Sequence, residues 1–108
     1  MANTFTRYVS KNVGTTPVVL VTAASATQTT VIGLTASNTT ASPITVDVYI
    51  TASATNYYLV KGATVPVGGS LALFGSDGKL VLNTSDAFTV VASAASSADI
   101  ILSVLQIT

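Results

Sequence analysis

The sequence lacks the side chains that most enzymes use for proton transfer and nucleophilic attack. Its 108 residues contain no His, Cys or Trp, and all four acidic residues are aspartates. General acid–base and covalent catalysis rely mainly on His, Glu, Cys and on perturbed Asp or Lys groups. Without Cys there is also no disulfide framework and no Cys-based zinc site. We therefore expect no catalytic residue, no metal site and no cofactor; the protein is predicted not to be an enzyme.

Charge is also scarce, and its scarcity limits the classes of partner. Charged residues make up 7% of the chain and the net charge is zero, against roughly 25% charged residues in typical domains. Nucleic-acid binding needs clustered Lys and Arg, so no nucleic-acid partner is expected. A net charge near zero favours self-association, which predicts a homo-oligomer packed against neighbouring molecules.

No segment has the length or composition expected of a membrane span or a secretory signal. The longest aliphatic run, Val18–Val21, is far shorter than the ~20 residues that cross a bilayer. Residues 1–7 contain no apolar segment of the secretory type. We therefore expect no membrane partner, and synthesis and folding in a cytoplasm.

What the chain does contain is a period-two alternation of aliphatic and hydroxyl side chains. In the segment 44–51, Ile44, Val46, Val48 and Ile50 share one face, as in a half-buried β-strand. Similar runs predict strands at residues 4–9, 17–22, 29–37, 44–51, 57–61, 70–74, 79–82, 87–93 and 99–107. The last of these is apolar on both faces for most of its length, which indicates a central strand or one packed on both sides.

Clusters of Gly, Pro, Asn and Asp separate these runs about every ten residues and mark turns. Gly68-Gly69 is expected at the apex of a hairpin. Eight or nine short strands with such spacing predict an all-β fold, a single antiparallel β-sandwich that is Ig-like or jelly-roll-like. Residues 14–108 are expected to form the sandwich, and residues 1–13 either an edge strand or an N-terminal arm.

The aspartates and lysines give little support for chemistry. Asp77 and Asp86 lie in turn clusters, where Asp usually caps its own backbone. Asp47 alternates with core residues, so its carboxylate is expected to point away from the core. A Ser–Lys dyad is not excluded by composition, but no spacing favours one.

Aromatic residues are the best candidates for recognition. Tyr57 and Tyr58 are neighbours on a predicted strand, so they point to opposite faces and at most one fills the core easily. An exposed Tyr is favoured at binding surfaces because it is amphipathic and loses little entropy on ordering. In the N-terminal segment, Phe5, Arg7 and Tyr8 are the expected interface anchors.

A longer-range sequence pattern extends over residues 30–108. It consists of Leu34–Thr40, Ile44–Val46, Tyr58–Leu71, Gly78–Leu82, Ser85–Val90, Ala98-Asp99 and Ser103–Ile107. Over residues 30–108 this pattern resembles small virion structural proteins of tailed bacteriophages. The resemblance implies a β-sandwich in the virion that binds the major capsid protein or other virion proteins, with no catalytic residue to transfer.

The leading hypothesis is a capsid decoration or cement protein, a small oligomer such as a trimer that stabilises the shell. One alternative is a tail, baseplate or fibre component of the same kind of particle. Another is a carbohydrate-binding β-sandwich module that uses Tyr57 or Tyr58.

Overall fold

The computed structural model describes residues 3–74 and 79–108, which form nine β-strands and contain no helix. The strands are β1 (Asn3–Val13), β2 (Val18–Thr22), β3 (Gln28–Asn38), β4 (Ile44–Ala52), β5 (Thr55–Val65), β6 (Ser70–Leu73), β7 (Leu80–Leu82), β8 (Ala87–Ala92) and β9 (Ala98–Ile107). Each predicted strand overlaps an observed one, so the all-β prediction is confirmed. The predicted turn at residues 75–78, including Asp77, lies outside the described residues.

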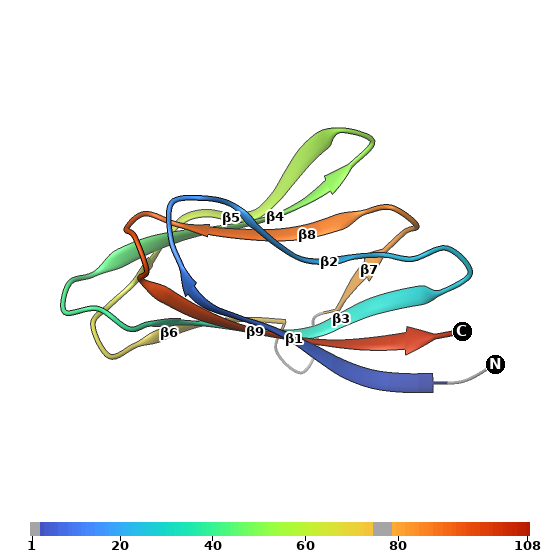
Figure 1. Ribbon diagram of the computed structural model, residues 1–108, viewed down its shortest axis with the longest axis horizontal. Coiled ribbons are helices and arrows are strands. Elements are labelled where there is room, and N and C mark those ends of the chain that lie inside the picture. The colour runs from blue at the N-terminus through green and yellow to red at the C-terminus, as the bar shows by residue number, and fades with distance from the viewer. Residues whose placement is uncertain (1–2, 75–78) are drawn as a thin grey trace.

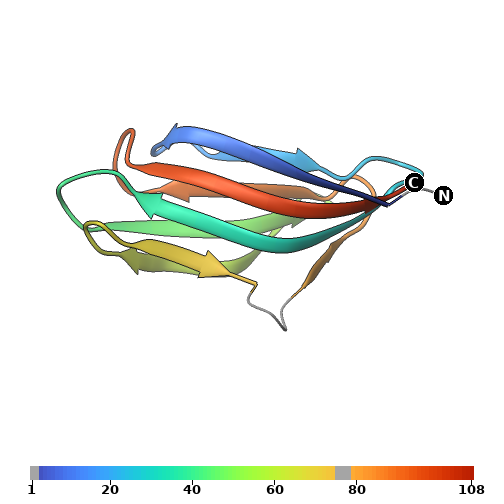
Figure 2. The same ribbon diagram turned by 90° about the horizontal axis from the view of Figure 1, so that it is seen from below.

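The strands form two antiparallel sheets that lie face to face (Figures 1 and 2). Sheet A has the order β1-β9-β3-β6, with β7 also paired to β3, and sheet B has the order β2-β8-β4-β5. The molecule measures 45 × 28 × 22 Å. β9 lies between β1 and β3, as its apolar character on both faces predicted.

The strand order distinguishes a jelly roll from an immunoglobulin fold. If the short β7 is set aside, the first strand pairs with the last, the second with the seventh, the third with the sixth and the fourth with the fifth. This nested pairing is that of one long antiparallel ribbon rolled into two sheets, the jelly-roll arrangement of eight strands. It brings the first and last strands side by side in sheet A.

The core lies between the sheets and follows the alternation in the sequence. Val46 and Val48 of β4, Phe88 of β8, and Leu102 and Val104 of β9 are fully buried in one apolar cluster. Burial of apolar area is the main favourable term in folding. The cluster also receives residues from β1, β2, β3, β5 and β7, so residues far apart in the sequence must be ordered together.

In β4 the alternation is interrupted after Val48. The β4–β5 register shifts on both sides of Val48, and Tyr49 is buried although strict alternation would place it on the outer face with Asp47. Its ring packs on the ring of Tyr58 in the neighbouring strand, with 4.9 Å between the two ring centroids. The side chain of Tyr49 is therefore buried by its cross-strand aromatic pair with Tyr58.

One turn differs from its expected form. The turn at Gly68-Gly69 exists, with Gly68 at φ 72° and the Gly69 N–H donating to the Pro66 carbonyl. It connects β5 in sheet B to β6 in sheet A, so the prediction of a hairpin apex is wrong. The true hairpin joins β4 to β5 through Ser53 and Ala54, both with positive φ, which is a two-residue turn of type I′.

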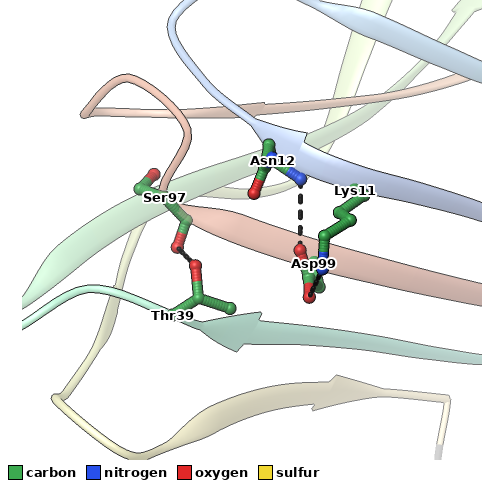
Figure 3. A network of polar contacts seen from close by, with 5 residues as sticks. All are labelled: Lys11, Asn12, Thr39, Ser97 and Asp99. Carbon is green, nitrogen blue, oxygen red and sulfur yellow. Dashed lines mark hydrogen bonds and ion pairs between the residues drawn. The ribbon is translucent and has the colours of Figure 1, made fainter.

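Side chains fix one end of the sandwich (Figure 3). β1 bulges after Ser10, and the Asn12 backbone N–H donates to Asp99 Oδ1 at 3.1 Å instead of to a ladder carbonyl. Lys11 Nζ lies 3.8 Å from the other oxygen of Asp99. Nearby, Thr39 Oγ1 donates to the Ser97 carbonyl at 3.3 Å. The regular part of β1 therefore ends at Ser10.

Candidate binding surface

β1 is the longest regular free edge of the two sheets. It pairs with β9 without interruption from Asn3 to Ser10, and the described part of the chain provides no strand on its other side. The other edges are protected in ways that commonly prevent strand addition. β2 is short and bulged, and β6 has only four residues. β5, the other edge of sheet B, is irregular because its register with β4 is interrupted near Lys61 and Gly62. The edge of β1 is therefore the best template for an added strand.

The strand places two of its three predicted anchors on the outer face. Phe5 is 73% exposed and Arg7 is also exposed, because alternate residues of β1 face away from the core. Tyr8 lies on the opposite face, half-buried against the core. Its hydroxyl accepts a hydrogen bond from Gln106 Nε2 at 2.9 Å. The structure thus brings Phe5 and Arg7 together and separates them from Tyr8.

The register of sheet A aligns the outer side chains in rows across the strands. Arg7 on β1 is opposite Ser103 on β9, which is opposite Gly33 on β3. In the adjacent row, Phe5 is opposite Leu105. In the row that begins at Arg7, Ser103 and Gly33 are much smaller than the residues of the adjacent row. The surface of the sheet is therefore lowest at these two positions.

A β-bulge deepens this low point. β3 has one extra residue, Ile32, between Val31 and Gly33 in its register with β9. A Cβ at Gly33 would meet no atom within 4 Å, and its φ lies outside the left-handed region. The result is an open hollow of about 470 Å³ lined by Phe5, Thr6, Arg7, Ile32, Ser103 and Val104. We call this feature the Gly33 hollow, because Gly33 is opposite the lining residue Ser103.

Arg7 contributes an uncompensated positive charge to the hollow. Within residues 3–74 and 79–108, no carboxylate lies within 4.0 Å of its guanidinium. The aspartates of these segments, Asp47, Asp86 and Asp99, each accept a hydrogen bond from a backbone N–H of the same molecule. The backbone contact of Asp86 within its own turn confirms the expected cap. The hollow therefore combines apolar walls, a hydroxyl and a free cation.

The other two predicted anchors lie on the β4–β5 hairpin, whose end stands out from the sandwich at the top of Figure 1. Tyr57 and Tyr58 are 56% and 44% exposed. The ring of Tyr58 packs on Tyr49, and Lys61 Nζ lies 4.7 Å from its centroid. The ring of Tyr57 makes no such aromatic or cation contact among the described residues. Tyr57 is thus the freer of the two rings.

The described segments contain no candidate metal site. Nowhere in them do three acidic residues gather at a distance that could hold a metal ion. Lys11 lies near Asp99, and Lys61 lies over Tyr58. Nor do these segments include a helix long and apolar enough to cross a membrane.

Sequence reasoning missed Ser103, which lines the hollow, and Gly33, which is opposite Ser103 at the bulge of β3. A signal was available at Gly33, since an isolated Gly inside a strand pattern often marks a bulge or an open position on the sheet. Ser103 carried no local signal. Its importance comes from its position between Arg7 and Gly33, which only the strand register reveals.

Comparison with known proteins supports the fold. The sequence matches no protein-family model and no curated relative. Among solved structures, it is similar to a chain of the Bacillus endospore appendages, described as a novel family of disulfide-linked pili, with a TM-score of 0.54 and 13% sequence identity. The alignment covers 98% of this chain and 88% of that chain. At this sequence identity, the likeness shows only that the two chains share a β-sandwich fold.

Proposed function

We propose that this protein is a non-enzymatic structural subunit that acts by binding neighbouring subunits, including copies of itself. The observation that carries the proposal is the free edge of β1 beside an apolar outer face. Along this edge Phe5 and Val9 are 73% and 62% exposed, and Val9 is opposite the exposed Ile101 of β9. Contiguous exposed apolar side chains mark interaction surfaces, and a free strand edge supplies backbone hydrogen bonds to a partner.

The particle that we propose is a virion, in which the protein decorates or cements the capsid shell. The resemblance of residues 30–108 to small phage virion proteins supports this assignment. A jelly roll is also a frequent fold of viral capsid domains. In this role, the protein would bury apolar and hydroxyl-rich surface across joints between capsid subunits and so oppose shell expansion.

A second candidate is a subunit of a fibre on a phage tail or a cell surface. It is favoured by the likeness in fold to a chain of Bacillus pili. Those pili are described as disulfide-linked, whereas the 108 residues here contain no Cys. Contacts between copies through these residues would therefore form without disulfides. Imaging of assembled particles separates the candidates, since decoration requires hundreds of copies per shell and a tail part requires far fewer.

The edge itself is tested by adding charge to it. In the variant Phe5→Lys plus Val9→Lys, four cations would line β1 together with Arg7 and Lys11, and two such edges would repel each other. The control, Val19→Lys plus Val67→Lys, adds the same charge at exposed positions of β2 and of the turn after β5. We expect sedimentation velocity to show loss of self-association in the first variant and its retention in the control. A wild-type protein that stays monomeric and binds no other structural protein contradicts the proposal.

A further inference from the structure

We infer that the Gly33 hollow of one molecule receives the Tyr57 side chain of a second copy. This inference rests on the proposed self-assembly and specifies one of its contacts. The hollow lies on the outer face of sheet A, whereas Tyr57 belongs to the β4–β5 hairpin of sheet B. The contact therefore joins two different surfaces.

Tyr57 has the position and freedom that such a contact requires. It is the third residue of β5, close to the two-residue turn at the end of the protruding hairpin (Figure 1). More than half of its side chain is exposed, while Tyr58 is already packed between Tyr49 and Lys61. A rigid aromatic side chain at a hairpin end loses little entropy when it is bound.

The lining of the hollow suits an aromatic ring with a hydroxyl. Phe5 and Ile32 supply apolar walls, and aromatic pairs such as Tyr–Phe gain energy beyond their buried area. The Arg7 guanidinium provides a cation for the ring face. The Ser103 hydroxyl is a hydrogen-bond partner for the phenol. The volume of about 470 Å³ leaves room for one such side chain.

The pattern of charges favours a ring over a carboxylate as the counterpart of Arg7. Asp47, Asp86 and Asp99 already accept backbone hydrogen bonds within their own molecule. Each of these carboxylates is thus partly engaged before a second copy arrives, and Asp99 also pairs with Lys11. The exposed ring of Tyr57 has no aromatic or cation contact of its own among the described residues.

A contact between two different surfaces leaves a free hollow at one end of the pair and a free hairpin at the other. Association of this kind continues into a ring or an open chain instead of stopping at a dimer. This property provides the test. A molecule that has lost its hollow can still offer Tyr57, and a molecule that has lost Tyr57 can still offer its hollow.

The two variants are Gly33→Leu, which fills the hollow, and Tyr57→Ala, which removes the ring. Gly33 tolerates the larger side chain because its Cβ direction is open and its φ is outside the left-handed region. Gly33→Val serves as a second filling variant if the Leu variant melts lower than wild type. The matched controls are Ala72→Leu, on the same face of sheet A, and Thr55→Ala, at an exposed position of the same hairpin.

Each variant alone is expected to associate roughly 10- to 100-fold more weakly than wild type, the range for loss of a central aromatic contact. The controls are expected to associate like wild type. When Gly33→Leu and Tyr57→Ala are mixed, native mass spectrometry should show 1:1 heterodimers and no larger species from this contact.

Three results overturn the inference. If wild type and both variants associate equally, the contact is not used, although the proposed structural role stands. If the variants are impaired but their mixture gives no heterodimer, Tyr57 and the hollow do not meet. If wild type is monomeric at all concentrations and binds no structural partner, both the inference and the proposed function are wrong.

Discussion

Asn38 at the end of β3 holds three segments together, and its replacement should be costly. Its side chain is buried. The amide Nδ2 donates to the carbonyl oxygens of Ser42 at 2.8 Å and Val65 at 3.1 Å. Its Oδ1 accepts hydrogen bonds from the backbone N–H and the hydroxyl of Thr40, both at 2.8 Å. Asn38 thereby fixes the β3–β4 loop and ties it to the end of β5.

The magnitude of the effect follows from which partners water can replace. In Asn38→Ala, the partly exposed groups of Thr40 and Ser42 can bond to water, at a net loss of about 0.5–1 kcal/mol each. Val65 is buried, and a buried polar group without its partner costs about 1–3 kcal/mol. We expect a total loss of about 2–5 kcal/mol. Since 1 kcal/mol shifts Tm by roughly 4 °C in a domain of this size, Tm should fall by about 8–20 °C.

Asn38→Asp tests the direction of the hydrogen bonds. An ionised carboxylate cannot donate to the carbonyls of Ser42 and Val65, whereas the protonated form can donate to one of them. The folded-state pKa of the introduced carboxyl should therefore lie above the value of about 3.9 for free Asp. Its contribution to stability is then present below about pH 3.9 and lost as pH rises through the folded-state pKa. Relative to wild type, this variant should be less destabilised near pH 3 than at pH 7.

The assay is chemical denaturation followed by circular dichroism at both pH values, with Asn38→Ala as the variant that has no titrating group. A loss below 1 kcal/mol for Asn38→Ala would show that water replaces the side chain and that the loop is not anchored by it. A loss in Asn38→Asp that is the same at pH 3 and pH 7 would contradict the assigned donor directions.

Three further predictions concern stability and can be checked by thermal unfolding. Thr29 is fully buried and its Oγ1 has no hydrogen-bond partner, so Thr29→Val should stabilise the protein by about 1–2 kcal/mol; a lower Tm would mean that the hydroxyl is satisfied. Ala54 has φ 64° in the hairpin turn. Ala54→Gly should raise stability by about 0.5–1 kcal/mol because Gly adopts this conformation without strain; an unchanged or lower Tm would argue against strain at the turn. Lys11 forms an ion pair with Asp99 in which the Lys11 side chain is 81% exposed. Lys11→Ala should therefore change stability by no more than about 0.5 kcal/mol, and a larger loss would show that the ion pair stabilises the fold.

The strands were predictable because each carries its own signal. The alternation from Ile44 to Val48 is a local consequence of a strand with one buried face. The sequence marks the type of the β4–β5 turn only weakly, since Ser53 and Ala54 stand in place of the Asn-Gly type of residue that normally marks such a turn. Here the pairing of the two strands determines the turn.

The candidate surface was predictable only in part. Phe5 and Arg7 could be proposed as anchors because alternation places them on one face, and the same alternation explains why Tyr8 lies on the other. The Gly33 hollow required the register of three strands, because Ser103 in its lining and Gly33 beside it are 70 positions apart in the chain.

The sequence alone determined that this chain is all-β, poorly charged and without the usual catalytic side chains, because composition and period-two alternation are properties of each short segment. Only the tertiary structure decided that the strands wind as a jelly roll, that β1 is left as a free edge, and that a hollow forms beside Arg7. Strand order depends on which distant apolar faces pack together and which strands pair, and no short stretch of sequence contains that information.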